Sequence, residues 1–153
     1  LGELHQEVFD FKDRFRLPGM RVLQFGFSNY NAVLRDLPHN FNIESVVYTG
    51  THDNNTILGW YRSLNENDKR AINTYLGAPV TEESIANVIC RLAYSSVCSM
   101  AILPVQDILG LDDHARINTP SVAKGNWQWR LLPGQLTKAA SQKLLSWGKI
   151  YNR

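Results

Sequence analysis

This sequence has almost no excess of charge of one sign, only two cysteines and no long apolar run. Its 153 residues carry 16 lysines and arginines against 14 acidic residues, and the basic residues do not form runs. A net charge of +2 spread in this way argues against nucleic acid as a partner. The apolar runs are far too short to span a membrane, so we expect no membrane partner either.

Cysteine occurs only twice, at Cys90 and Cys98. This spacing suits neither a disulfide framework nor a metal site. The two residues indicate buried, reduced thiols in a reducing compartment such as the cytoplasm. Internal repeats and low-complexity segments are absent as well, and the length is that of one domain.

Helical and strand patterns alternate along the chain. Apolar and β-branched stretches predict strands at 21–27, 45–49 and 97–103. Helices are predicted around residues 4–15, from 66 to Gly77, from Thr81 onward and over 135–151, with a long loop at 111–133. Strands without strict alternation are typical of a parallel sheet covered by helices, which predicts an α/β fold. Three strands form either a small open sheet or part of an eight-stranded barrel.

A polar cluster follows the second predicted strand. The sequence YTGTHDNNT, residues 48–56, places His52, Asp53 and Asn54 just after Gly50. In parallel α/β folds the functional groups lie at the carboxyl ends of strands. An aspartate there can stabilise a developing cation, and a histidine can donate to a bound hydroxyl. The alternative is that Asp53 caps the helix that follows, with His52 merely exposed.

Two tryptophans, Trp127 and Trp129, lie in the long loop beside Asn126 and Arg130. This composition is common in carbohydrate sites, because a sugar ring stacks on indole while amides bind its hydroxyls. The alternative is that the indoles close a barrel wall or a small core of the loop.

A histidine–aspartate pair also occurs in metal-dependent phosphohydrolases of the HD type. His39, Asp112, Asp113 and His114 could then supply further ligands. Those enzymes are all-helical and carry the pair on a helix, whereas residues 46–50 here are a poor helix former. The sequence therefore favours a strand-end site without a metal.

Four segments, in order, resemble the 4-α-glucanotransferases, also called amylomaltases or disproportionating enzymes. They are LPGMRVLQFGF at 17–27, YTGTHDN at 48–54, PVQDILGL at 104–111, and RINTP with GNWQWR between 116 and 130. The match covers almost the whole chain. The resemblance implies that residues 1–153 are the C-terminal part of one (β/α)8 TIM barrel, about three β/α units, with no separate second domain.

The resemblance also implies a retaining transfer of α-1,4-glucan segments between malto-oligosaccharides, without a cofactor or metal. By motif, Asp53 is similar to the carboxylate that stabilises the transition state, and His52 to a histidine that binds the sugar. Phe25 is similar to an aromatic near the acceptor and Asn118 to a sugar-binding amide, and we place Asn54 in the same substrate site. The implied location is the cytoplasm, or the plastid stroma in a plant.

The family's nucleophile and its acid/base are not found in this sequence. Leu1-Gly2 resembles the end of a Glu-Asp-Leu-Gly segment whose Glu is the acid/base. We therefore expect both groups upstream and the isolated chain to be inactive. Ser28-Asn29 stand where many members have acidic residues, which weakens any acceptor-side role there. A sugar-binding module without chemistry remains an alternative.

Overall fold

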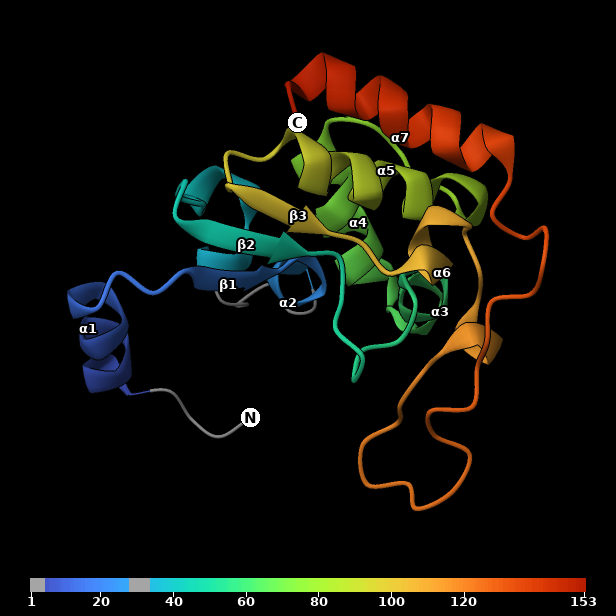
Figure 1. Cartoon of the computed structure of the whole chain (residues 1–153), viewed down its shortest axis with the longest axis horizontal. Coiled ribbons are helices and arrows are strands. Elements are labelled where there is room, and N and C mark those ends of the chain that lie inside the picture. Colours follow the sequence, from blue (N-terminus) through green and yellow to red (C-terminus); the bar gives the residue numbers. More distant parts are fainter. Residues whose placement is uncertain (1–4, 28–33) are drawn as a thin grey trace.

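The computed structural model describes residues 5–27 and 34–153, and it has an α/β fold built on a small parallel sheet. The strand order is β1 (Gly19–Val22), β2 (Ser45–Tyr48), β3 (Met100–Ile102), with β2 in the centre. The larger helices α4, α5 and α7 lie together on one side of the sheet (Figure 1). Helix α1 lies apart from them, beyond the amino end of β1. The helices are α1 (Gln6–Arg14), α2 (Leu23–Phe27), α3 (Ile57–Ser63), α4 (Glu66–Leu76), α5 (Glu82–Ser95), α6 (Val105–Ile108) and α7 (Lys138–Tyr151). The prediction of an α/β fold is confirmed.

The two faces of the sheet differ in what covers them. Val47, at the centre of β2, is fully buried against the helices, together with Ile85 and Ile89 of α5. The opposite face carries Met20 and Met100, which lie in one row of the strand register and are about half exposed. The core therefore lies on the helical side, and the other side of the sheet is an open apolar surface.

The first predicted strand, 21–27, is wrong over residues 23–27. The strand ends at Val22 and residues 23–27 form α2 instead. The Val22 N–H donates to Asp36 Oδ1, and a Cβ at Gly26 would lie 2.3 Å from the Asp36 carbonyl oxygen. This close approach of two backbones bends the chain out of the sheet, and only a glycine allows it. Phe25 therefore lies on a helix rather than on a strand.

The predicted helix boundaries agree better with the structure. Gly77 ends α4 with a φ of 70°, and Thr81 opens α5 in a capping box with Ser84. The third strand is only Met100–Ile102, and the last helix begins after its cap Thr137. Ser28 and Asn29 lie outside the described residues. Nowhere in residues 5–27 and 34–153 is there a helix with the length and apolar character needed to cross a bilayer.

A buried carboxylate ties the end of the central strand to the helical layer. Asp107 of α6 is 2% exposed, and its Oδ2 accepts a hydrogen bond of 2.5 Å from Thr49 Oγ1, just beyond β2. Its Oδ1 accepts the N–H of Ile57, the first residue of α3, at 2.8 Å. Burial raises the pKa of Asp107, and the two hydrogen bonds oppose that rise.

We expect Asp107→Ala to destabilise the chain by about 2–5 kcal/mol, because a buried hydroxyl and a buried N–H lose their partner. Asp107→Asn is the matched control, since its amide can serve both partners. Denaturant unfolding at one fixed protein concentration checks this. Equal free energies of unfolding for the two variants would contradict the bridging role.

The same comparison carries a pH dependence. Free aspartate has a pKa of about 3.9, and the pKa of Asp107 in the folded chain is higher. At a pH between these two pKa values, Asp107 is protonated in the folded chain and ionised in the unfolded chain. Stability relative to Asp107→Asn should be greatest below pH of about 3.9 and should fall as the pH rises through the folded pKa. A difference that grows with pH would contradict the raised pKa.

The open apolar face of the sheet leads to a further prediction. The isolated chain should self-associate and bind a dye such as ANS. Among the described residues, β1 and β3 each pair on one side only, and the sheet face between them is apolar. The double variant Met20→Gln/Met100→Gln should reduce both effects. Leu132→Gln, in the long loop, removes similar exposed apolar surface and should not. Size-exclusion chromatography that shows a monomer without dye binding would contradict this prediction.

Candidate functional site

A cavity of about 660 Å³ opens over the carboxyl ends of β2 and β3. Its floor is apolar and comes from the uncovered sheet face, with Met20, Tyr48 and Ile102. Its wall is polar and comes from the loops that follow the strands; it includes His52, Asp53, Asn54 and Arg116. An apolar floor with a few fixed polar groups is the usual form of a small-molecule site.

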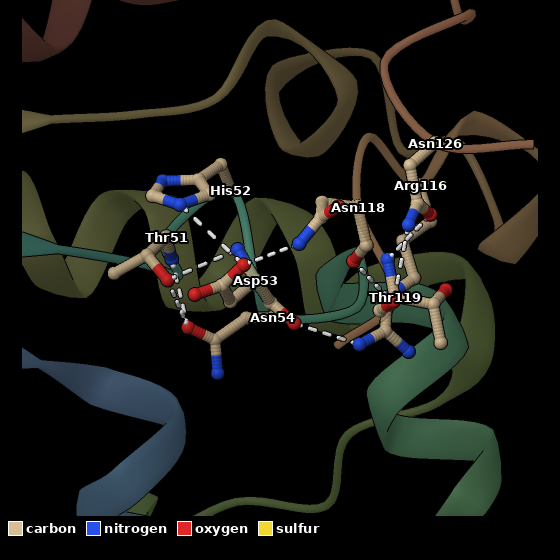
Figure 2. Close-up of polar contacts among 8 residues, drawn as sticks. All are labelled: Thr51, His52, Asp53, Asn54, Arg116, Asn118, Thr119 and Asn126. Carbon is tan, nitrogen blue, oxygen red and sulfur yellow. Dashed lines mark hydrogen bonds and ion pairs between the residues drawn. The ribbon is translucent and has the colours of Figure 1, made fainter. Parts of the chain in front are cut away.

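The turn after β2 is held by its own side chains (Figure 2). Asn54 Oδ1 accepts from the Thr51 N–H at 2.9 Å and from Thr51 Oγ1 at 2.8 Å. Gly50 precedes this turn, where a Cβ would lie 2.7 Å from Gln24 Nε2. Gln24 in turn donates to the Asn55 carbonyl at 2.8 Å. The amide oxygen of Asn54 thus shapes the turn, and its contact with a substrate stays a prediction.

The Asp53 carboxylate lies at the centre of the polar wall. Its Oδ1 accepts from Asn118 Nδ2 at 2.6 Å and lies 3.4 Å from His52 Nε2. Both the Asp53 and His52 side chains are about half exposed, at 49% and 55%. The structure thus brings together three of the predicted site residues, one of them 65 positions further along the chain.

The alternative that Asp53 caps the next helix is wrong. The N-cap of α3 is Thr56, whose Oγ1 accepts the Gly59 N–H at 3.2 Å. The first N–H of α3 is already bound by Asp107. Thr56 and Asp107, rather than Asp53, therefore bind the N-terminal N–H groups of Gly59 and Ile57, and Asp53 lines the cavity.

The long loop closes the polar wall on its far side. Arg116 Nη2 donates to the Asp53 carbonyl at 2.7 Å, and its Nε donates to the Asn118 carbonyl at 2.8 Å. The Trp127 ring lies beside the His52 ring, with centroids 5.2 Å apart. Sequence reasoning assigned no role to Arg116. Its only signal was its place two residues before Asn118 in the RINTP segment.

Phe25 lies further from the cavity than the predicted site residues of the 52–54 turn. It lies on α2, which follows the carboxyl end of β1, and is 40% exposed. It is not among the residues that line the cavity. A role for Phe25 in binding an acceptor stays a prediction.

Metal-type side chains gather at a different place. Within the part of the chain that the structure describes, the group that could hold an ion consists of Asp112, Asp113 and His114. His52 and Asp53 do not belong to it. Asp112 already contacts His114 Nδ1 at 3.1 Å and Arg62 Nη1 at 3.6 Å. The His52–Asp53 pair lies in a turn after a strand rather than on a helix. Neither the pair nor this group has the arrangement that the HD-type alternative requires.

Comparisons with known proteins identify the family. A family model described as 4-alpha-glucanotransferase matches residues 1–137. The chain is 42% identical over 153 residues to a 4-alpha-glucanotransferase of Streptococcus pneumoniae and 43% identical over 131 residues to a chloroplastic/amyloplastic one of Solanum tuberosum. These matches cover 100% and 86% of this chain. Among solved structures, the amylomaltase from Streptococcus agalactiae in complex with acarbose superposes with a TM-score of 0.92 at 32% identity, over all of this chain.

The chain spans only part of these relatives. It covers 30% of the Streptococcus pneumoniae protein, 22% of the Solanum tuberosum protein and 31% of the solved amylomaltase. Within that part the family match is nearly continuous, and it includes the strands and the turn that carry the Asp53 cluster. The chain belongs to the 4-alpha-glucanotransferase family.

Proposed function

We propose that this chain is the part of a retaining 4-α-glucanotransferase that holds the sugar at the cleavage site. The observation that carries the proposal is the Asp53 carboxylate, which is fixed by Asn118 and His52 and faces a cavity at the carboxyl ends of parallel strands. In this proposal residues 1–153 form about three units of a (β/α)8 barrel. The open apolar face of the sheet supports it, because that face would meet the other strands inside a closed barrel.

The chemistry needs three carboxyl groups with different roles. A nucleophile attacks C1 of the sugar as the α-1,4 bond breaks, and a second carboxyl gives its proton to the leaving oxygen. The same second group then takes a proton from the 4-hydroxyl of the acceptor, whose oxygen displaces the enzyme from C1. In this proposal both groups come from residues outside this sequence, so the isolated chain is inactive.

Asp53 has the third role. Positive charge develops on the sugar ring as the bond breaks, and a carboxylate that is already fixed in place stabilises it without reorganising. Asn118 holds Asp53 from one side, with His52 beside it, while the cavity side stays open to sugar hydroxyls. His52 donates to one of those hydroxyls, with Asn54 and Phe25 further along the substrate.

The substrate class proposed is α-1,4-glucans and malto-oligosaccharides. The similar amylomaltase from Streptococcus agalactiae was solved in complex with acarbose, which supports a carbohydrate ligand. The apolar floor formed by Tyr48 and Ile102 is suited to the apolar face of a sugar ring. The location proposed is the cytoplasm, or the plastid stroma if the source is a plant.

A binding module without chemistry is the second candidate. Its support is the absence of a nucleophile and an acid/base from this sequence. The two candidates differ in what Asp53 does: in a binding module it contributes to affinity, whereas in the transferase it contributes mainly to turnover.

In the full-length enzyme, Asp53→Asn should lower kcat by about 10²–10³-fold, because the charge acts chiefly in the transition state. KM should change much less, and the melting temperature should stay close to that of the wild type, since the side chain is half exposed. Maltotriose disproportionation, followed by released glucose, gives kcat and KM. A wild-type kcat with a raised KM would favour the binding module.

His52→Ala should lower kcat by about tenfold, less than the Asp53 change, because it removes a single hydrogen bond. His52→Gln is the matched control, since glutamine keeps a donor near the same place. Specific activity and melting temperature should be measured on one preparation. A lower melting temperature with intact specific activity would show that His52 is only structural.

A further inference from the structure

One guanidinium group joins the two segments that form the polar wall of the cavity. Arg116 donates through Nη2 to the Asp53 carbonyl at 2.7 Å and through Nε to the Asn118 carbonyl at 2.8 Å. The side chain of Asn118 donates back to Asp53 Oδ1 at 2.6 Å. These bonds close a ring from the main chain of Asp53 through Arg116 and Asn118 to the carboxylate of Asp53 (Figure 2).

We infer that Arg116 is a positioning residue, which sets the direction of the Asp53 carboxylate by fixing the main chain on both sides of the Asn118–Asp53 hydrogen bond. The inference rests on the proposed function of Asp53. Arg116 touches no carboxyl oxygen of Asp53 and acts on it only through the backbone and through Asn118.

The surroundings of Asp53 make such a device necessary. The turn itself is held from within by Thr51 and Asn54. The N–H groups of Asp53 and Asn54 both donate to Thr51, at 3.3 and 3.2 Å, and none of these bonds involves the Asp53 carboxylate. The carboxylate is half exposed, so the core does not fix its orientation. The remaining constraint comes from two side chains of the long loop. Asn118 binds the carboxylate itself, and Arg116 binds the main-chain carbonyls of both Asp53 and Asn118.

The geometry requires an arginine rather than any cation. The two acceptors are carbonyl oxygens on separate segments, and a planar guanidinium presents Nε and Nη2 in a fixed fork that reaches both. Among the described residues, no carboxylate lies within ion-pair distance of Arg116, so its contacts are directional hydrogen bonds to neutral carbonyls. A lysine would carry the charge without the fork.

The same loop offers a matched control. Arg130 Nη1 donates to the Trp127 and Trp129 carbonyls, both at 2.8 Å. Like Arg116, it donates to two main-chain oxygens, but both of its acceptors lie within the loop and neither belongs to Asp53. Removing either arginine costs the loop two hydrogen bonds, and only Arg116 connects them to the carboxylate.

The test uses the full-length enzyme and four changes: Arg116→Ala, Arg116→Lys, Arg130→Ala, and Arg116→Ala combined with Asp53→Asn. We expect Arg116→Ala to lower kcat by about 10–100-fold with little change in KM, since small misplacements of a reacting geometry cost that much. Arg116→Lys should recover only part of this loss, and Arg130→Ala should keep kcat within about twofold of wild type. Millimolar guanidinium added to Arg116→Ala should restore part of kcat.

The combined variant decides whether Arg116 works through Asp53. Residues that act as a unit lose activity non-additively, so Arg116→Ala should reduce kcat by less than about threefold in the Asp53→Asn background. A multiplied, full loss in that background would overturn the inference while leaving the proposed function intact. A wild-type kcat in Asp53→Asn itself would overturn both.

Two further results would overturn the inference alone. One is a kcat for Arg116→Ala equal to that of Arg130→Ala. The other is a melting temperature far below that of Arg130→Ala with no recovery of kcat by guanidinium, because that outcome describes a loop that has merely unfolded.

Discussion

The buried carboxylate of Asp107 is the constraint on which the site depends. It binds the end of β2 through Thr49 and the first N–H of α3 through Ile57, so both ends of the intervening turn are fixed by one side chain. A buried carboxylate without these partners would be costly, and a buried N–H without the carboxylate would be costly too. The carboxylate and its two donors therefore hold one another in place, and the segment from Thr49 to Ile57 has a fixed distance between its ends.

This arrangement leaves the Asp53 carboxylate out of the cap of α3. Asp107 accepts the N–H of Ile57 and Thr56 accepts that of Gly59, so the cap of α3 is Thr56 and not a residue of the 51–54 turn. The turn then folds on Thr51 and Asn54, and the long loop approaches it from the other side through Arg116 and Asn118. The site is thus a half-exposed carboxylate on a rigid support, which is the form expected of a group that stabilises developing charge.

The sequence correctly predicted those features that depend on residues close together in the chain. The helix end at Gly77 follows from glycine's access to positive φ, and the helix start at Thr81 follows from hydroxyl capping. The polar cluster after the second strand was predicted from its place beyond a buried strand. These features depend on neighbours within a few residues, so one sequence is enough to find them.

The features that the sequence did not predict all depend on distant partners. The bend after Val22 arises because Gly26 lies against the Asp36 backbone, and Asp107 acquires its role from Thr49, 58 residues earlier. Arg116 contacts Asp53 across 63 residues. Composition and spacing carry no information on such contacts. The motif match named Asn118 as a sugar-binding amide, which stays a prediction. It did not predict the hydrogen bond from that amide to the carboxylate of Asp53.

The central claim is that Asp53 and His52 bind the sugar at the cleavage site. A crystal structure of the full-length enzyme with a malto-oligosaccharide across that site tests it most directly. The account predicts an Asp53 carboxylate oxygen and His52 Nε2 within about 3.2 Å of hydroxyls on the same sugar ring. A sugar bound across the cleavage site while Asp53 contacts only Asn118 and His52 would contradict it.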